Sequence, residues 1–195
     1  MNRIAPETNF SGITGSMVAA VRIGVWSATV VAVGYLLVFL PNIEGVSITV
    51  ALAGATLGWR SGIAIGAIGE GLYSLLNPWG PPGVFLLIAQ VLGVALLGGV
   101  AGFYQKVFPG TTLLHRLGWG LVGLLMSIVF DVITVLSFPL LAGMEKVSLT
   151  TILVMQIPFT AVKAAVNTVL FFVAIVPLRD KLQVALAQSL FRRVS

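Results

Sequence analysis

Four polar side chains recur on one face of an otherwise apolar segment near the C-terminus. Gln156, Thr160, Lys163 and Asn167 are spaced four, three and four residues apart, so they share a face if the segment is helical. An ammonium group inside an apolar helix is costly, so Lys163 must meet a partner or a hydrated cavity. The spacing therefore predicts a polar wall that can bind a solute.

A second polar face lies in the preceding apolar segment, where Ser127, Asp131 and Thr134 share one side of a helix. An ion pair between Asp131 and Lys163 is predicted. The pair could be a structural clasp between two helices, one wall of a binding pocket, or part of a proton relay. Glu70 is an alternative partner for Lys163, which would leave Asp131 for a ligand or a proton.

Further polar and aromatic residues are expected near the ends of the apolar segments that face the outside of the cell. They comprise one amide within a segment and several residues at segment ends and in loops: Gln90, Tyr73, Asn77, Trp79, Asn42 and Glu44. A single Trp or Tyr at this depth is also typical of an interfacial anchor. Together these residues predict a binding site that opens to the outside.

The sequence argues against several other kinds of chemistry. It contains no cysteine, and His115 is its one histidine, without a cluster of His, Asp or Glu at the spacing of metal ligands. His115 is expected to be a solvated residue at the interface. No nucleophile, base and orienting group occur together, and no G-x-x-x-x-G-K-[ST] sequence is present. We expect no enzyme activity, no metal site and no cofactor.

The elements that carry these residues are predicted to be membrane helices. Of the 195 residues, 58% are hydrophobic and 9% are charged, which is typical of an all-α membrane protein. A single membrane domain over residues 1–195 is expected. Six apolar segments predict six transmembrane helices, at about 17–40, 45–59, 62–76, 84–104, 117–141 and 149–176. The second and third are short for a span, and Pro158 predicts a bend in the last.

The basic residues orient these helices. If there are six crossings, nine of the eleven Lys and Arg residues lie on one side: Arg3, Arg22, Arg60, Lys106, Arg116, Arg179, Lys181, Arg192 and Arg193. Basic residues are retained on the cytoplasmic side, so both termini are predicted to lie inside. Residues 1–16 would form a cytoplasmic segment, and residues 177–195 a cytoplasmic tail that could be an amphipathic helix.

Small residues recur every four positions in the first apolar segment. Ala20, Gly24, Ala28 and Ala32 form one stripe, and small residues let another helix approach closely within a membrane. The stripe could pack within this chain, or it could be a docking face for a partner subunit. Glycine pairs at 54/58, 62/66 and 98/102 are expected to pack internally.

Several short sequences occur in a characteristic order between about residues 31 and 176. They are Pro41-Asn42-Ile43-Glu44, Gly58-Trp59-Arg60-Ser61-Gly62, Leu72-Tyr73-Ser74-Leu75-Leu76-Asn77-Pro78-Trp79-Gly80, Ala89-Gln90-Val91-Leu92-Gly93, Phe130-Asp131-Val132-Ile133-Thr134, Ile157-Pro158-Phe159 and Asn167. Taken together they resemble the substrate-binding S component of an energy-coupling factor (ECF) vitamin transporter.

The resemblance implies six helices with both termini inside and a binding site formed by outer loops and helices four to six. It implies that Ala28 and Ala32 dock on a transmembrane T subunit, and that two cytosolic ATPases supply the energy. The location would be a bacterial or archaeal cytoplasmic membrane. The ligand would be a vitamin or related micronutrient, with cobalamin or a precursor favoured. Relatives often have histidine at the position of Lys163, and a lysine favours an anionic or carbonyl-bearing substrate unless Asp131 or Glu70 neutralises it.

Two other classes of protein compete with this interpretation. A small ion- or proton-coupled carrier would use Asp131, Lys163 and Glu70 as its relay. Such a carrier would transport alone in vesicles with an ion gradient, whereas an S component binds its vitamin alone but needs partners for transport. An intramembrane enzyme would need a catalytic constellation that the sequence does not show.

Overall fold

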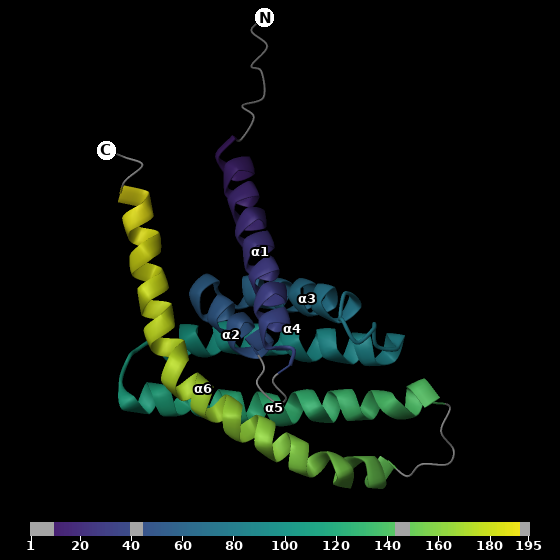
Figure 1. The fold of residues 1–195 in the computed structure, drawn as a ribbon. Helices are drawn as coiled ribbons and strands as arrows, with labels where there is room; N and C mark the ends of the chain where they lie inside the picture. Colours follow the sequence, from purple (N-terminus) through teal and green to yellow (C-terminus); the bar gives the residue numbers. More distant parts are fainter. Residues whose placement is uncertain (1–9, 40–44, 143–148, 192–195) are drawn as a thin grey trace, which may run out of the picture.

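The computed structural model describes residues 10–39, 45–142 and 149–191, and every regular element in these ranges is a helix (Figure 1). The predicted all-helical class and the six helices are confirmed for this part of the chain. The helices are α1 (Phe10–Leu37), α2 (Gly45–Leu57), α3 (Trp59–Leu75), α4 (Val84–Val107), α5 (Leu113–Ala142) and α6 (Leu149–Phe191).

Four of the helices have segments long and apolar enough to cross a membrane: Gly15–Leu37, Val84–Val107, Leu113–Ser137 and Leu149–Ala185. The predicted shortness of the second and third helices is confirmed, with 13 residues in α2 and 17 in α3. At a rise of about 1.5 Å per residue, α2 is only about 20 Å long, less than a hydrocarbon layer of about 30 Å. The number of crossings and their orientation stay predictions.

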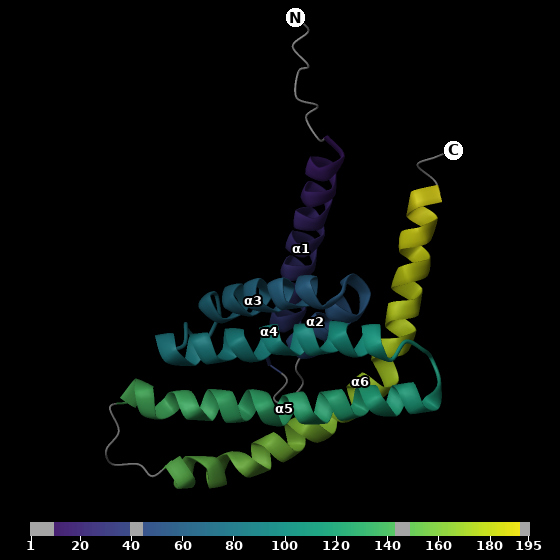
Figure 2. The ribbon, with the colours of Figure 1, turned by 180° about the vertical axis from the view of Figure 1, so that it is seen from behind.

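The helices form two neighbouring pairs, α3 with α4 and α5 with α6 (Figures 1 and 2). In both views α1 runs across the α3–α4 pair, and its N-terminal part projects beyond that pair. The short α2 packs against α1, α3, α4 and α6. Most of its residues are buried, and Val50, Ala51 and Ala53 have no exposed surface. This central position explains why α2 is apolar on all sides.

Glycines allow α3 and α4 to pack backbone against backbone. A Cβ on Gly62 would clash with the Gly98 carbonyl, and a Cβ on Gly98 would clash with the Gly62 carbonyl. One turn further along α4, a Cβ on Gly102 would clash with the backbone of Trp59. Small residues in membrane helices permit such close approach. Internal packing is therefore confirmed for the 62/66 and 98/102 pairs and for Gly54, whereas a Cβ on Gly58 would meet no atom within 4 Å, so the prediction is wrong for that residue.

The last helix is longer than the sequence suggested. The helix expected at 149–176, followed by a separate tail, is instead one helix that includes Pro158 and Pro177 and ends at Phe191. Its C-terminal part turns away from α5 in both views (Figures 1 and 2). A proline within a helix removes one hydrogen bond and crowds the preceding turn, so Pro177 accounts for a change of direction without an end to the helix.

The connection between α4 and α5 is also more tightly packed than expected. The prediction of a solvated His115 is wrong, because this residue is only 6% exposed. Trp119 Nε1 donates a hydrogen bond to His115 Nε2 at 3.0 Å, and the ring of Tyr104 stacks on His115. Arg179, also buried, donates to Gln105 Oε1 and to the carbonyl of Gly110. These contacts tie the second part of α6 to the end of α4.

Candidate functional site

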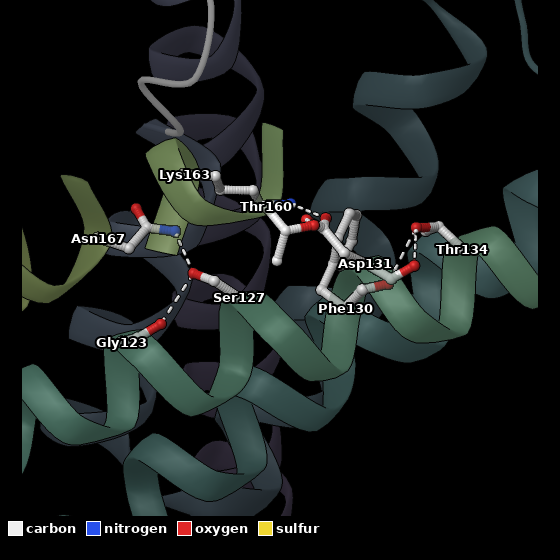
Figure 3. A network of polar contacts seen from close by, with 8 residues as sticks. All are labelled: Gly123, Ser127, Phe130, Asp131, Thr134, Thr160, Lys163 and Asn167. Atoms are coloured by element: carbon white, nitrogen blue, oxygen red, sulfur yellow. Dashed lines mark hydrogen bonds and ion pairs between the residues drawn. The ribbon is translucent and has the colours of Figure 1, made fainter. Parts of the chain in front are cut away.

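The predicted ion pair between α5 and α6 is confirmed. Lys163 Nζ lies 2.8 Å from Asp131 Oδ1, and both residues are buried (Figure 3). Thr160 Oγ1 donates a second hydrogen bond to Asp131 Oδ2 at 2.5 Å. Lys163 Nζ also lies 3.9 Å from the centre of the Phe130 ring, which is within the range of a cation–π contact. Both carboxylate oxygens are therefore engaged, and the negative charge of Asp131 balances the lysine.

A second polar contact joins the same two helices about one turn away. Asn167 Nδ2 donates to Ser127 Oγ at 2.8 Å, and Ser127 Oγ donates to the Gly123 carbonyl at 2.8 Å (Figure 3). A Cβ on Gly123 would meet the backbone carbonyl of Asn167, so the glycine lets the helices come close enough for this contact. Asn167 Oδ1 is buried and has no hydrogen-bond partner among the described residues. Such an acceptor costs about 1–3 kcal/mol and is suited to a donor from a ligand or a water.

Two cavities flank the Asp131–Lys163 pair. The smaller, of about 10 Å³, lies inside the bundle and has Ser47, Ser127, Lys163 and Asn167 among its lining residues. This volume is about that of one water-sized probe. The larger cavity, of about 490 Å³, lies between α5 and α6 and includes Asp131 in its lining. Its volume falls within the usual range of about 300–1,000 Å³ for small-molecule sites.

The larger cavity has an apolar wall with a few polar groups. Gln156, Thr160 and Asp131 are its polar lining residues, and the rest of the lining is aliphatic. Ile128 and Ile157 line the cavity and are both exposed, so the cavity opens at the surface of the helix pair. A ligand there would meet hydrocarbon side chains and three groups able to form hydrogen bonds.

The remaining predicted site residues fall into a second group around α3 and the loop that follows it. Ser74 Oγ is within hydrogen-bond distance of Glu70 Oε1 (2.8 Å) and of Gln90 Oε1 (3.2 Å), and Glu70 is buried. The Asn77 side chain accepts a bond from the Trp79 backbone at 2.9 Å. Trp79 is largely exposed, and the ring of Tyr73 packs edge-on against Tyr35. These contacts order the end of α3.

Thr134 is buried, but its hydroxyl donates to carbonyls of its own helix, those of Phe130 and Asp131. It therefore supports α5 and does not reach across to α6 in these contacts. Asn42 and Glu44 lie outside the described residues.

Sequence reasoning missed two contributors to this region. Phe130 contacts Lys163 only because α5 and α6 pack together, and although it begins one of the sequences that carry the resemblance, its residue type gave no sign of this contact. Ser74 lies four residues after Glu70, and that spacing could have indicated their contact. Thr160 was placed on the correct helix face, but its bond to Asp131 depends on the relative position of the two helices.

The family model described as "ECF transporter, substrate-specific component" matches residues 16–175, which is most of the chain. The chain belongs to this family. Comparison with curated proteins and with solved structures gave no significant match. As a member of the ECF substrate-specific component family, the protein is a membrane transport protein, and the family is a transporter family, not an enzyme family.

The matched range of this ECF substrate-specific component contains both groups of candidate residues and the small-residue stripe on α1. Ala20, Gly24, Ala28 and Ala32 are all exposed, and a Cβ on Gly24 would meet no atom within 4 Å. The opposite side of α1 is the one that packs, because Ser27 and Val30 are buried. The stripe therefore does not pack against other described residues of this chain, so the predicted alternative of internal packing is wrong for this part of the structure.

Proposed function

We propose that this protein is the high-affinity substrate-binding subunit of an ECF-type uptake transporter for a vitamin or related micronutrient. The family match supports the role, and the observation that carries the site is the buried Asp131–Lys163 pair with the half-buried Thr160, beside a cavity of about 490 Å³. Polar groups at such depth in apolar helices mark substrate pathways. The substrate would contact Asp131, Gln156 and Thr160, which line this cavity. Lys163 and Asn167 would lie behind them, where they line the smaller cavity inside the bundle.

The charge balance at the site bears on the class of substrate. A lone lysine would favour an anionic ligand, but Asp131 is within 2.8 Å of Lys163 and neutralises it. The cavity wall is otherwise aliphatic. These features favour a neutral or carbonyl-bearing ligand with a large apolar surface. Cobalamin or one of its precursors is the substrate that we propose, on the resemblance alone.

Transport requires partners in this proposal. The exposed stripe Ala20, Gly24, Ala28 and Ala32 would dock on a transmembrane T subunit, because its open surface lets a second helix approach closely. Two cytosolic ATPases would supply the energy. The protein would lie in a bacterial or archaeal cytoplasmic membrane with both termini inside, in keeping with the distribution of its basic residues.

The proposal is tested by purification of the protein alone. A substrate-binding subunit should retain its vitamin through purification, and mass spectrometry of the released small molecules should identify it. The same protein in vesicles should not accumulate that vitamin until the T subunit and the ATPases are added. Uptake by the protein alone, driven by an ion gradient, would instead support the carrier that uses Asp131, Lys163 and Glu70 as a relay.

A further inference from the structure

A groove on the surface of the α3–α4 pair lies apart from the cavities beside Asp131. It has a volume of about 550 Å³, and its walls include Ile63, Leu96 and Phe103, which are between 39% and 60% exposed. Gly99 is part of the lining and has no side chain to fill the groove. The groove therefore offers apolar surface along two helices, on the side that faces away from the core.

One end of this groove is cationic. Lys106, in the last turn of α4, and Trp59, the first residue of α3, line that end together. The guanidinium carbon of Arg60 lies 5.1 Å from the centre of the Trp59 ring, which places a second cation beside this lining residue. No acidic residue lines the groove. Neither Arg60 nor Lys106 has an ion-pair partner among the described residues.

We propose that this groove binds one anionic phospholipid. An acyl chain would lie against Ile63, Leu96 and Phe103, and the phosphate would lie near Lys106 and Arg60. Basic pockets between membrane helices on the cytoplasmic side bind anionic head groups, and Trp is typical of the interface where those head groups lie.

The distribution of polarity favours a lipid over a partner helix. The groove is apolar along its length and charged at a single end, which matches a molecule with a long hydrocarbon tail and one anionic group. A membrane helix would be apolar along the whole groove and would leave Lys106 and Arg60 without a counter-charge. The same two cations belong to the set of basic residues that the sequence places at the cytoplasmic side. The proposal is independent of which substrate the protein transports.

The test compares two lipids on the full-length protein. Purified protein in detergent is equilibrated with equal amounts of phosphatidylglycerol and phosphatidylcholine, and native mass spectrometry counts the lipid that stays bound. We expect phosphatidylglycerol to be retained in preference. Retention should fall about tenfold or more in the double variant Arg60→Gln, Lys106→Gln, because each basic residue near the head group contributes about 1 kcal/mol.

A charge-matched control separates a site from general basicity. The double variant Arg116→Gln, Lys181→Gln removes the same charge from residues that do not line the groove and should retain phosphatidylglycerol as the unmodified protein does. Gly99→Leu keeps both cations but places its Cβ 2.9 Å from the Ile63 side chain, so it pushes Ile63 and its own side chain into the groove and should also release the lipid.

Three results would overturn the proposal. The first is equal retention of the two lipids, and the second is an equal loss in the two Gln double variants. The third is unchanged lipid retention in Gly99→Leu. If that variant kept its lipid and lost association with the partner subunits, the groove would be a protein-docking face.

Discussion

The two helix pairs of this protein are held together in opposite ways. In α3–α4, glycines such as Gly62 and Gly98 bring two backbones into contact, and no side chain stands between them. In α5–α6, a buried ion pair and two hydrogen bonds through Thr160 and Asn167 join the helices, with a cavity on either side. Close backbone packing leaves no room for a solute. Polar side chains next to a cavity, in contrast, can form hydrogen bonds with a solute that enters it. This difference gives the first pair a structural role and supports the proposal that the second pair binds the substrate.

The largest effect is expected from breaking the polar pair. Lys163→Met leaves the Asp131 carboxylate buried without its cation, which costs about 3–5 kcal/mol when one partner of a buried pair is removed. We expect a marked fall in the thermal unfolding temperature of the purified protein and strongly weakened vitamin binding. Normal ligand binding in this variant would remove Lys163 from the site.

A smaller effect is expected from the glycine-packed pair. Gly98→Ala places a Cβ against the Gly62 carbonyl and should lower the free energy of unfolding by about 1–3 kcal/mol, as overpacking typically does. Gly24→Ala is the matched control, because its Cβ would meet open space. Thermal unfolding measures both. If the two variants were equally stable, the account of α3–α4 as a sealed interface would be wrong.

The small residues of α3 and α4 are packed against a neighbouring helix, whereas those of the α1 stripe are exposed. Ala28→Leu adds bulk to an exposed position, so it should change stability by less than about 0.5 kcal/mol and leave vitamin binding intact. It should abolish co-purification with the T subunit, because a partner helix could no longer approach closely. Lost vitamin binding together with preserved association would contradict a docking role for the stripe.

The smallest effect is expected from single cysteine substitutions, which test the predicted orientation of both helix pairs in the membrane. The chain has no cysteine, so single cysteines report position without background. Pro81→Cys, in the loop between α3 and α4, should react with an impermeant thiol reagent added from outside. Thr111→Cys, between α4 and α5, should react only from inside. Both positions are exposed, and the reverse labelling pattern would invert the predicted topology.

Much of the architecture could be predicted from the sequence because it depends on periodicity. The spacing of Gln156, Thr160, Lys163 and Asn167 placed one polar face on α6, and an acid on the neighbouring helix supplied the partner for Lys163. The glycine repeats in α3 and α4 predicted close packing, which the structure has.

Features that depend on the relative position of helices could not be predicted in the same way. The last membrane helix was predicted to end at about residue 176, yet α6 continues through Pro177, and Arg179 beyond it is bound to Gln105 and Gly110. His115 was expected to be solvated because it was placed in the connection next to Arg116, but its partner Trp119 and the stacked Tyr104 bury it. The cavity lined by Asp131 lies between α5 and α6, so its shape depends on both helices and no single segment encodes it.

In the proposed site the buried Asp131–Lys163 pair of α5 and α6 takes part in substrate binding and is more than a clasp between helices. The most direct test is the double variant Lys163→Met, Asp131→Asn, measured for unfolding temperature and for vitamin affinity in the same preparation. Because both charges are gone, stability should return close to that of the unmodified protein. Vitamin affinity should stay low, since two polar groups of the site are lost. Recovery of both stability and affinity would show that the pair is only structural and would contradict the account.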